Sequence, residues 1–216
     1  MDKDFGKLIH SSKPNNAEPK KGLFSFLKKT YVNEVDVFEK GLKLKAKVGT
    51  RDVHYSELLG ISDSVHRHVN NPSNARTFQI EVRGEKQNAL FNYINEGDIQ
   101  DFALVADTIT DTYTAFLLDG LTKANIAQAN ISFTDSVSYV DFELKNGKFM
   151  YGRIFGKKKE TDEIAVSDIT SVRISPGIVD LMRQKNGKEK TWQSLPLLNT
   201  LNIRVLYSIV HDIMQK

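Results

Sequence analysis

The chain has 216 residues, of which 40% are hydrophobic and 26% are charged, and it carries a formal net charge of +3 at pH 7. This is the composition of an ordinary soluble globular protein, and no run of about 18 apolar residues predicts a transmembrane helix. The absence of cysteine excludes disulfides, thiolate metal sites and cysteine nucleophiles. Residues 1–5 lack the apolar core of a secretory signal, so we expect a cytoplasmic location, with association with a membrane surface left open.

Charge is unevenly distributed along the chain. Residues 1–30 contain seven Lys and three acids, residues 31–120 contain nine bases and fourteen acids, and residues 121–216 contain fourteen bases and ten acids. An acidic first half and a basic second half would attract each other weakly, because salt screens such fields beyond about 8–10 Å. Chance scatter of a few side chains explains the asymmetry equally well.

Residues 1–30 are predicted to be a flexible basic tail, because residues 11–19 combine two prolines with no apolar periodicity. Two lysine pairs in this tail flank a short apolar segment that could insert at a membrane surface while the lysines meet anionic headgroups. The membrane-contact candidates are Leu23, Phe24, Phe26 and Leu27. Because the segment is shorter than three helical turns, packing of Leu23, Phe24 and Leu27 onto the first domain is the favoured alternative.

Residues 31–120 are predicted to form a first domain of strands followed by a helix. The clearest pattern covers 42–48, where Leu42, Leu44, Ala46 and Val48 alternate with lysines, as in a half-buried strand. Further strands are expected at 33–39, before Ile61, at 78–82 and at 89–94, with a polar loop over 62–75. A helix is expected from about Glu96, with an apolar stripe at Ile99, Phe102, Ala106, Ile109, Tyr113, Phe116 and Leu117 and a C-cap at Gly120.

Residues 121–135 are predicted to be a linker, and residues 136–216 a second domain with the same order of elements. Strands are expected at 138–144, 149–155, 178–182 and 190–193, with turns at 145–147 and 185–187 and a charged loop at 156–160. Pro196 is expected in the first turn of a helix. The apolar stripe of that helix is Leu198, Leu201, Val205, Leu206, Ile209 and Ile213.

One stretch occurs twice in altered form. His54 to Ile61 and Ala165 to Val172 each place a serine followed by an acidic residue immediately before an apolar strand. Ser56 and Ser167 are 111 residues apart, and the glycines of the preceding hairpin turns, Gly41 and Gly147, are 106 apart. This near-constant spacing favours a duplicated domain.

Each half, with antiparallel strands closed by one amphipathic helix, resembles the pleckstrin-homology-like superfold, and the serine–acid step is similar to that of GRAM and bacterial pleckstrin-homology-type domains. The resemblance implies an α+β, mostly β fold: two tandem domains, each a small bent antiparallel barrel closed by a C-terminal helix. It also implies a binding module rather than an enzyme, because many such domains bind phosphoinositides or peptides. The basic residues that match the phosphoinositide motif of this superfold are Lys40, Lys43, Lys45, Lys47 and Arg51.

Two basic clusters are the candidate ligand-binding sites. The first comprises Lys43, Lys45, Lys47 and Arg51, and the lysine row could bind phosphate groups or could be the solvent face of a strand protected against edge pairing. The second comprises Lys157, Lys158 and Lys159, which could meet an anionic surface or form a solvated loop. His66 and His68 lack a third ligand at a telling spacing, so we expect no metal site, and no cofactor is expected.

No catalytic motif is present, so the chain is predicted not to be an enzyme. We expect a non-enzymatic binding or scaffolding module that recognises a protein partner or an anionic membrane surface. The alternative is a nucleic-acid-binding protein that uses the basic tail and the second domain. The sequence disfavours this alternative, because it lacks the interleaved aromatic and basic residues of a stacking platform.

Overall fold

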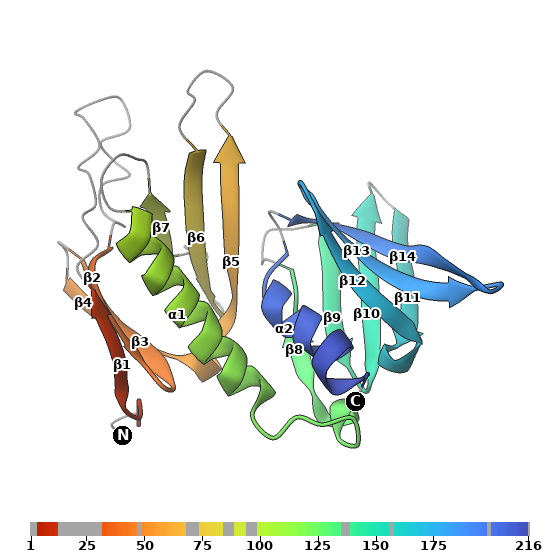
Figure 1. Cartoon of the computed structure of the whole chain (residues 1–216), viewed down its shortest axis with the longest axis horizontal. Helices are drawn as coiled ribbons and strands as arrows, with labels where there is room; N and C mark the ends of the chain where they lie inside the picture. Colours follow the sequence, from red (N-terminus) through yellow and green to blue (C-terminus); the bar gives the residue numbers. More distant parts are fainter. Residues whose placement is uncertain are drawn as a thin grey trace. The chain divides into compact units, whose positions relative to one another are not determined.

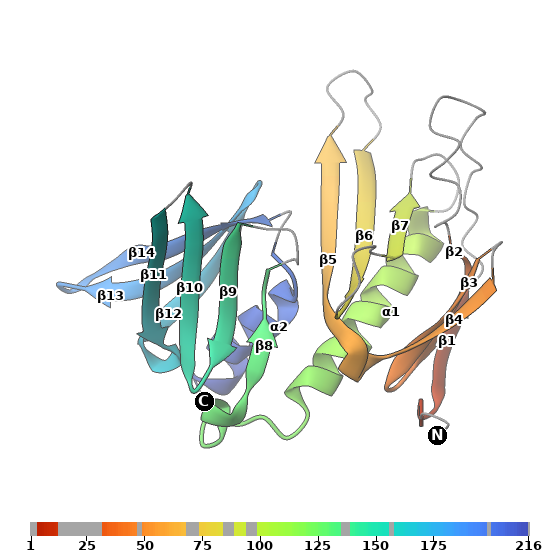
Figure 2. The same cartoon turned by 180° about the vertical axis from the view of Figure 1, so that it is seen from behind.

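The computed structural model describes residues 4–12, 32–46, 49–67, 74–83, 89–93, 99–134, 139–155, 158–197 and 200–215. The chain divides into two compact units, residues 1–116 and 117–216, and both are built mainly from antiparallel strands (Figures 1 and 2). This confirms the predicted mostly β architecture. In the described residues, no helix has both the length and the apolar character needed to cross a membrane.

In its described residues, unit 1 contains two sheets and one long helix. The first sheet has the order β1-β2-β3-β4, with strands β1 (Leu8–Ser12), β2 (Val32–Phe38), β3 (Gly41–Ala46) and β4 (Gly49–His54). The second has the order β5-β6-β7, with strands β5 (Leu58–Arg67), β6 (Asn74–Val82) and β7 (Ala89–Tyr93). The 3-10 helix η2 (Tyr55–Glu57) joins the sheets, and helix α1 (Ile99–Leu118) follows them.

Unit 2 repeats this order. Its four-stranded sheet comprises β8 (Asn130–Ser132), β9 (Val140–Lys145), β10 (Lys148–Phe155) and β11 (Lys158–Ala165). The 3-10 helix η4 (Val166–Asp168) leads to a three-stranded sheet of β12 (Ile169–Ser175), β13 (Ile178–Lys185) and β14 (Lys188–Pro196). Before the sheets lies the 3-10 helix η3 (Ile126–Gln128), and after them come α2 (Ile203–Ser208) and the π-helical turn η6 (Ile209–Ile213).

The repeated serine–acid stretch forms the corner between the two sheets in both units. In unit 1 this corner carries a capping box: the His54 ring accepts a hydrogen bond from the Ser56 backbone N–H, and Glu57 accepts one from the His54 N–H at 2.9 Å. The corresponding Val166–Asp168 turn has no side-chain cap. Among the described strands, each unit has two separate sheets, so the predicted closed barrel is not formed.

Several segments expected to be irregular are strands. Residues 8–12, within the predicted flexible tail, form β1 and pair with β2, and β8 lies within the predicted linker 121–135. Residues 62–67 extend β5 into the predicted polar loop, and residues 158–160 of the predicted charged loop begin β11. These segments are mostly polar and give no clear apolar alternation, and they are held by backbone pairing with a neighbouring strand.

The predicted apolar stripe and C-cap of the first helix agree with the structure, whereas the predicted start of the second helix is wrong. Helix α1 carries the predicted stripe, with Ala106, Ile109 and Tyr113 buried, and Gly120 has the left-handed φ of +68° expected of a C-cap. Pro196 was wrongly placed in the second helix, because it ends β14 and the helix begins at Ile203. A proline is compatible with the end of an edge strand, where its missing N–H leaves no gap in the sheet.

Unit 2 has a continuous aromatic and aliphatic core. The rings of Phe142 and Phe149 stack at 5.5 Å, and Phe133 and Trp192 lie beside Phe142. The helical segment adds buried Val205, Leu206, Ile209 and Val210. Trp192 is 8% exposed and belongs to this core.

Candidate binding surfaces

The predicted lysine row on β3 lies among acidic neighbours. The Lys45 Nζ is 2.5 Å from Glu34 Oε1 and 3.4 Å from Asp36 Oδ2, both on β2. The Lys43 Nζ is 4.0 Å from Asp52 Oδ2 on β4 and lies over the rings of Phe5 and Phe38. These two ammonium groups are therefore neutralised within the sheet.

The pKa values of Asp36 and Lys45 reflect the same hydrogen bonds and ion pairs. The Ser11 hydroxyl, which donates to Asp36 at 2.5 Å, is the main cause of the lowered pKa of Asp36, with Lys45 contributing further. The hydrogen bond from Lys45 to Glu34 raises the pKa of Lys45. A phosphate approaching this face would have to displace carboxylates that are already paired, which disfavours a phosphate site. The edge-protecting role expected of the lysines is wrong as well, because β3 lies between β2 and β4 and is not an edge strand.

Arg51 does not join this row. It is the register partner of Leu44, which is buried, whereas Lys43 pairs with Asp52 on the opposite, outward face. Because directly paired residues of antiparallel strands share a face, Arg51 lies on the other face of the sheet from Lys43 and Lys45. Lys47 lies outside the described residues, as do Leu23, Phe24, Phe26 and Leu27.

The second predicted basic cluster is partly described. Lys157 lies outside the described residues, and Lys158 is the first residue of β11. Lys159 is exposed and is the register partner of Ile154 on β10. It therefore stands on a strand beside an exposed apolar residue, rather than in a purely charged loop.

Exposed apolar side chains lie at the end of unit 2 that carries Lys159. Tyr139, Ile154, Ile174 and Ile178 are 78%, 47%, 53% and 45% exposed. The N–H of Ile154 donates to the carbonyl of Tyr139 at 2.9 Å, and Ile174 and Ile178 flank the turn between β12 and β13. In Figures 1 and 2 the start of β9, the end of β10 and the β12–β13 turn lie at the same end of unit 2. We call these four residues the apolar end.

A second surface is the hairpin of β13 and β14, which projects from unit 2 (Figures 1 and 2). Lys185 pairs directly with Lys188, and Arg183 pairs directly with Lys190. The alternation of the strands places all four cations on one face, and we call them the cationic ribbon. Within the described residues, none of their side chains makes a hydrogen bond or an ion pair.

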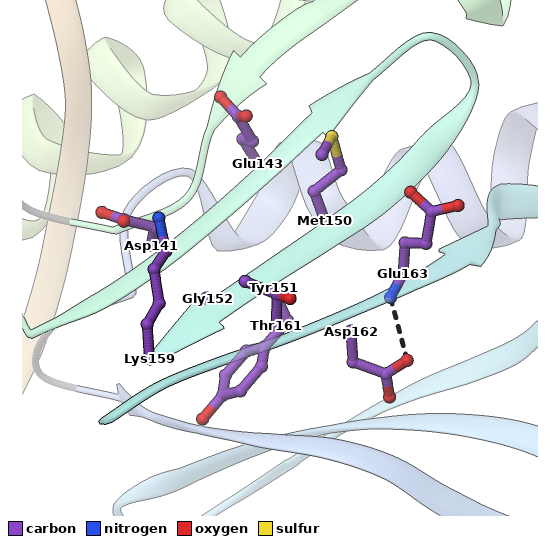
Figure 3. Close-up of a pocket in the computed structure, with 9 residues that line it drawn as sticks. All are labelled: Asp141, Glu143, Met150, Tyr151, Gly152, Lys159, Thr161, Asp162 and Glu163. Carbon is purple, nitrogen blue, oxygen red and sulfur yellow. Dashed lines mark hydrogen bonds between the residues drawn. The ribbon is translucent and has the colours of Figure 1, made fainter. Parts of the chain in front are cut away.

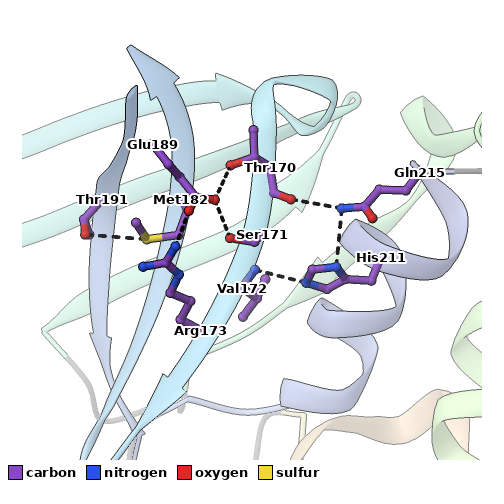
Figure 4. Close-up of polar contacts among 9 residues, drawn as sticks. All are labelled: Thr170, Ser171, Val172, Arg173, Met182, Glu189, Thr191, His211 and Gln215. Atoms are coloured by element: carbon purple, nitrogen blue, oxygen red, sulfur yellow. Dashed lines mark hydrogen bonds and ion pairs between the residues drawn. The ribbon is translucent and has the colours of Figure 1, made fainter. Parts of the chain in front are cut away.

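The one acidic residue near the hairpin tip makes its contacts on the face opposite the cationic ribbon. Glu189 pairs with Gln184, so it lies on the face opposite the cationic ribbon. It accepts hydrogen bonds from Ser171 at 2.8 Å and Thr170 at 2.9 Å, and it pairs with Arg173 (Figure 4). These contacts, led by the Ser171 and Thr170 hydroxyls, lower the pKa of Glu189. Glu189 therefore does not neutralise the ribbon.

Two hollows accompany these surfaces. One, of about 480 Å³, lies beside Gly152 on the four-stranded sheet and has acidic walls that include Asp141, Glu143 and Glu163 (Figure 3). The other, of about 530 Å³, is lined by Arg183 and by residues of β11 and η4. In neither lining does a serine or threonine lie beside a histidine, the pairing that would mark a nucleophile with its base.

No group of three or more His, Asp or Glu side chains in the described part of the chain could hold a metal ion. His66 lies on β5, and His68 is outside that part. Comparison of the chain with models of known protein families and with curated proteins finds no match.

Sequence reasoning missed both the apolar end and the cationic ribbon. The exposed isoleucines occupy strand positions with the same sequence pattern as core residues, so the sequence does not indicate that they are exposed. The ribbon did leave a signal: Lys185-Asn186-Gly187-Lys188 is a two-residue hairpin turn, which fixes the pairing of Lys185 with Lys188.

Proposed function

We propose that the chain is a non-enzymatic binding module made of two pleckstrin-homology-like domains in tandem. The proposal is supported by the order of a four-stranded antiparallel sheet, a 3-10 corner, a three-stranded sheet and a helix, which occurs in both units. The near match in spacing between the two serine–acid corners also favours duplication.

The proposed ligand of unit 2 is an anionic membrane surface, contacted through the apolar end. The observation that carries this proposal is the grouping of four of the five large exposed hydrophobic residues in the described part of unit 2 at one end. Lys159 stands beside Ile154, and Lys157 and Lys158 precede it in the sequence. Apolar side chains that enter the interface beside lysines that meet anionic headgroups are the recognised mode of peripheral membrane binding.

The expected affinity is low. A half-exposed apolar side chain that becomes buried contributes on the order of 1 kcal/mol, and a lysine near an anionic surface contributes about the same. Four apolar residues and Lys159 together give roughly 5 kcal/mol, which corresponds to a dissociation constant on the order of 10⁻⁴ M. The contact would therefore be reversible and would need a second contact for stable anchoring.

A protein partner fits this end less well. A stable protein interface buries about 800 Å² on each side around a contiguous apolar centre. The four residues of the apolar end come from the ends of three strands, β10, β12 and β13, and from the residue before β9, which suits shallow insertion into a fluid interface better than a shaped contact.

Cosedimentation with vesicles tests the proposal. The full chain should bind vesicles of phosphatidylcholine and phosphatidylserine at low salt and bind pure phosphatidylcholine weakly. The double substitution Ile174→Ser and Ile178→Ser should weaken binding about thirtyfold, because it removes two of the inserted side chains at about 1 kcal/mol each. The matched control is Leu104→Ser, which changes a 52% exposed residue of α1 in unit 1.

Two results would reject a membrane role for the apolar end. One is no binding of the wild-type chain to anionic vesicles at low salt. The other is an equal loss of binding in the Leu104→Ser control.

A further inference from the structure

The cationic ribbon carries an arrangement that costs stability. Like charges directly opposite each other on neighbouring strands repel, and here two such pairs, Lys185 with Lys188 and Arg183 with Lys190, follow one another. No carboxylate in the described residues pairs with any of them. An anionic ligand would relieve this repulsion.

The spacing of the four cations indicates the form of that ligand. Residues on one face of a strand recur about every 6.8 Å, and paired strands are separated by about 5 Å. An extended peptide in which every second residue is acidic presents carboxylates at the same interval of about 6.8 Å. Two successive carboxylates of such a peptide, lying along the ribbon, would reach its two cation pairs in turn, with one carboxylate for each pair.

Arg183 offers a more specific contact than the lysines. It is half-buried, and its Nε is fully buried without a hydrogen-bond partner in the described structure. It lines the hollow of about 530 Å³ together with Ser167 and Asp168. The guanidinium fork binds a carboxylate through two parallel hydrogen bonds, which a lysine cannot reproduce.

The other charges of the hollow limit what can enter. Lys148 pairs with Glu163, so these two side chains cancel each other. Asp168 is exposed, and no hydrogen bond or ion pair from a neighbouring side chain holds it within the described residues. It would repel a second carboxylate, so the hollow suits one acidic side chain at Arg183.

We propose that the cationic ribbon binds an acidic peptide segment in extended conformation, with one carboxylate held by Arg183 and Lys190 and the next by Lys185 and Lys188. This site is separate from the apolar end and does not depend on membrane binding. A single-stranded nucleic acid fits less well, because the ribbon carries no exposed aromatic ring for stacking and Trp192 is buried. A lipid surface also fits less well, since the hairpin turn Asn186-Gly187 offers no apolar side chain for insertion.

Fluorescence anisotropy with a labelled peptide of alternating Glu and Thr tests this proposal on the full chain. The peptide should bind, and an isomer with the same glutamates in one contiguous block should bind several-fold more weakly. Arg183→Lys, which keeps the charge but removes the fork, should weaken binding about tenfold. Asp168→Asn should strengthen it, and Lys123→Gln, an exposed residue of the same unit, should leave it unchanged.

The thermal unfolding of each variant is measured alongside, so that a loss of fold is distinguished from a loss of contact. Equal affinity for the two isomers, or an unchanged affinity in Arg183→Lys, would show that the ribbon senses charge alone and would overturn the proposal. Tighter binding of an oligothymidylate than of the alternating peptide would assign the ribbon to nucleic acid instead. Vesicle binding by the apolar end would be unaffected by any of these results.

Discussion

Gly41 lies where the segment before β1 crosses β3. A Cβ atom on Gly41 would lie 2.6 Å from two atoms of the Phe5 ring and 2.6 Å from the carbonyl oxygen of Val53. Phe5 also contacts Phe38 and His54 edge-on, at 5.7 and 5.9 Å. The missing side chain of Gly41 is therefore what lets the N-terminal segment dock through its one aromatic ring.

Substitution of Gly41 by Ala should destabilise unit 1, because either the Phe5 ring or the β4 backbone must move. Overpacking of this kind costs about 1–3 kcal/mol. Thermal or urea unfolding measures the change. Gly152→Ala is the matched control, since its Cβ would meet Asp141 at an ordinary 3.5 Å, and an equal loss of stability in both variants would contradict the explanation.

Glu189 gives a residue-scale prediction on pH. Its pKa in the folded chain lies below the ordinary value of 4.5, because Ser171, Thr170 and Arg173 favour the charged form. A carboxyl with a depressed folded pKa adds stability above its unfolded pKa, and this stability is lost as the pH falls through the folded value. Glu189→Gln should therefore lower the melting temperature of unit 2 at pH 7, and this difference should shrink as the pH falls below 4.5. A difference that stays the same at acidic pH would show that charge is not involved.

At the scale of elements, the π-helical turn closes an open sheet edge. β12 is the edge strand of its sheet, and its Val172 N–H donates to His211 Nε2 at 3.2 Å while Gln215 donates to the Thr170 carbonyl at 2.9 Å (Figure 4). Residues 170 and 172 are the alternate positions at which an incoming strand would pair. The two side chains thus occupy backbone groups that would otherwise template strand addition.

The double substitution His211→Ala and Gln215→Ala should expose this edge. Loss of the two hydrogen bonds should cost about 1–3 kcal/mol, and the Val172 amide should exchange its hydrogen faster with solvent. Hydrogen exchange followed by NMR measures both effects. Asp212→Ala changes an exposed residue of the same turn and serves as the control; unchanged protection of Val172 in the double variant would remove the edge-covering role.

The elements that the sequence predicted well are those with one buried face. The stripe of α1 and the alternation of Leu42 and Leu44 follow directly from burial, and both turns with Asn-Gly, at Asn146 and Asn186, have the positive φ values expected of tight hairpins. Strands such as β4, β8 and β11 were missed or cut short, because polar side chains cover much of their surface and backbone pairing decides their conformation.

The candidate site was less predictable than the fold. Lys43, Lys45 and Arg51 are all basic, and the sequence does not distinguish them. The strand register shows that the two lysines are paired with acids and that Arg51 lies on the other face of the sheet. Conversely, nothing in the spacing of Ile154 and Ile174 distinguishes an exposed strand end from a core position. Exposure depends on where strands end in space, which a one-dimensional pattern does not specify.

At the scale of the whole molecule, the described surfaces of the two units differ in their charged and apolar side chains. The described outer face of the first sheet in unit 1 balances its charges internally, as the contacts of Lys43 and Lys45 show. Unit 2 carries both the apolar end and the unpaired cations of the ribbon. The proposed binding functions therefore belong to unit 2, and unit 1 is expected to contribute little to vesicle binding through its described basic residues.

The most direct test of the membrane proposal is a measurement of insertion depth, for which the absence of native cysteine is convenient. A single cysteine at position 139, 174 or 186 is labelled with an environment-sensitive fluorophore, and emission is recorded with and without phosphatidylserine vesicles. The account predicts a blue shift for Tyr139→Cys and Ile174→Cys and no shift for Asn186→Cys at the tip of the ribbon. A shift at position 186 alone, or at none of the three positions, would contradict it.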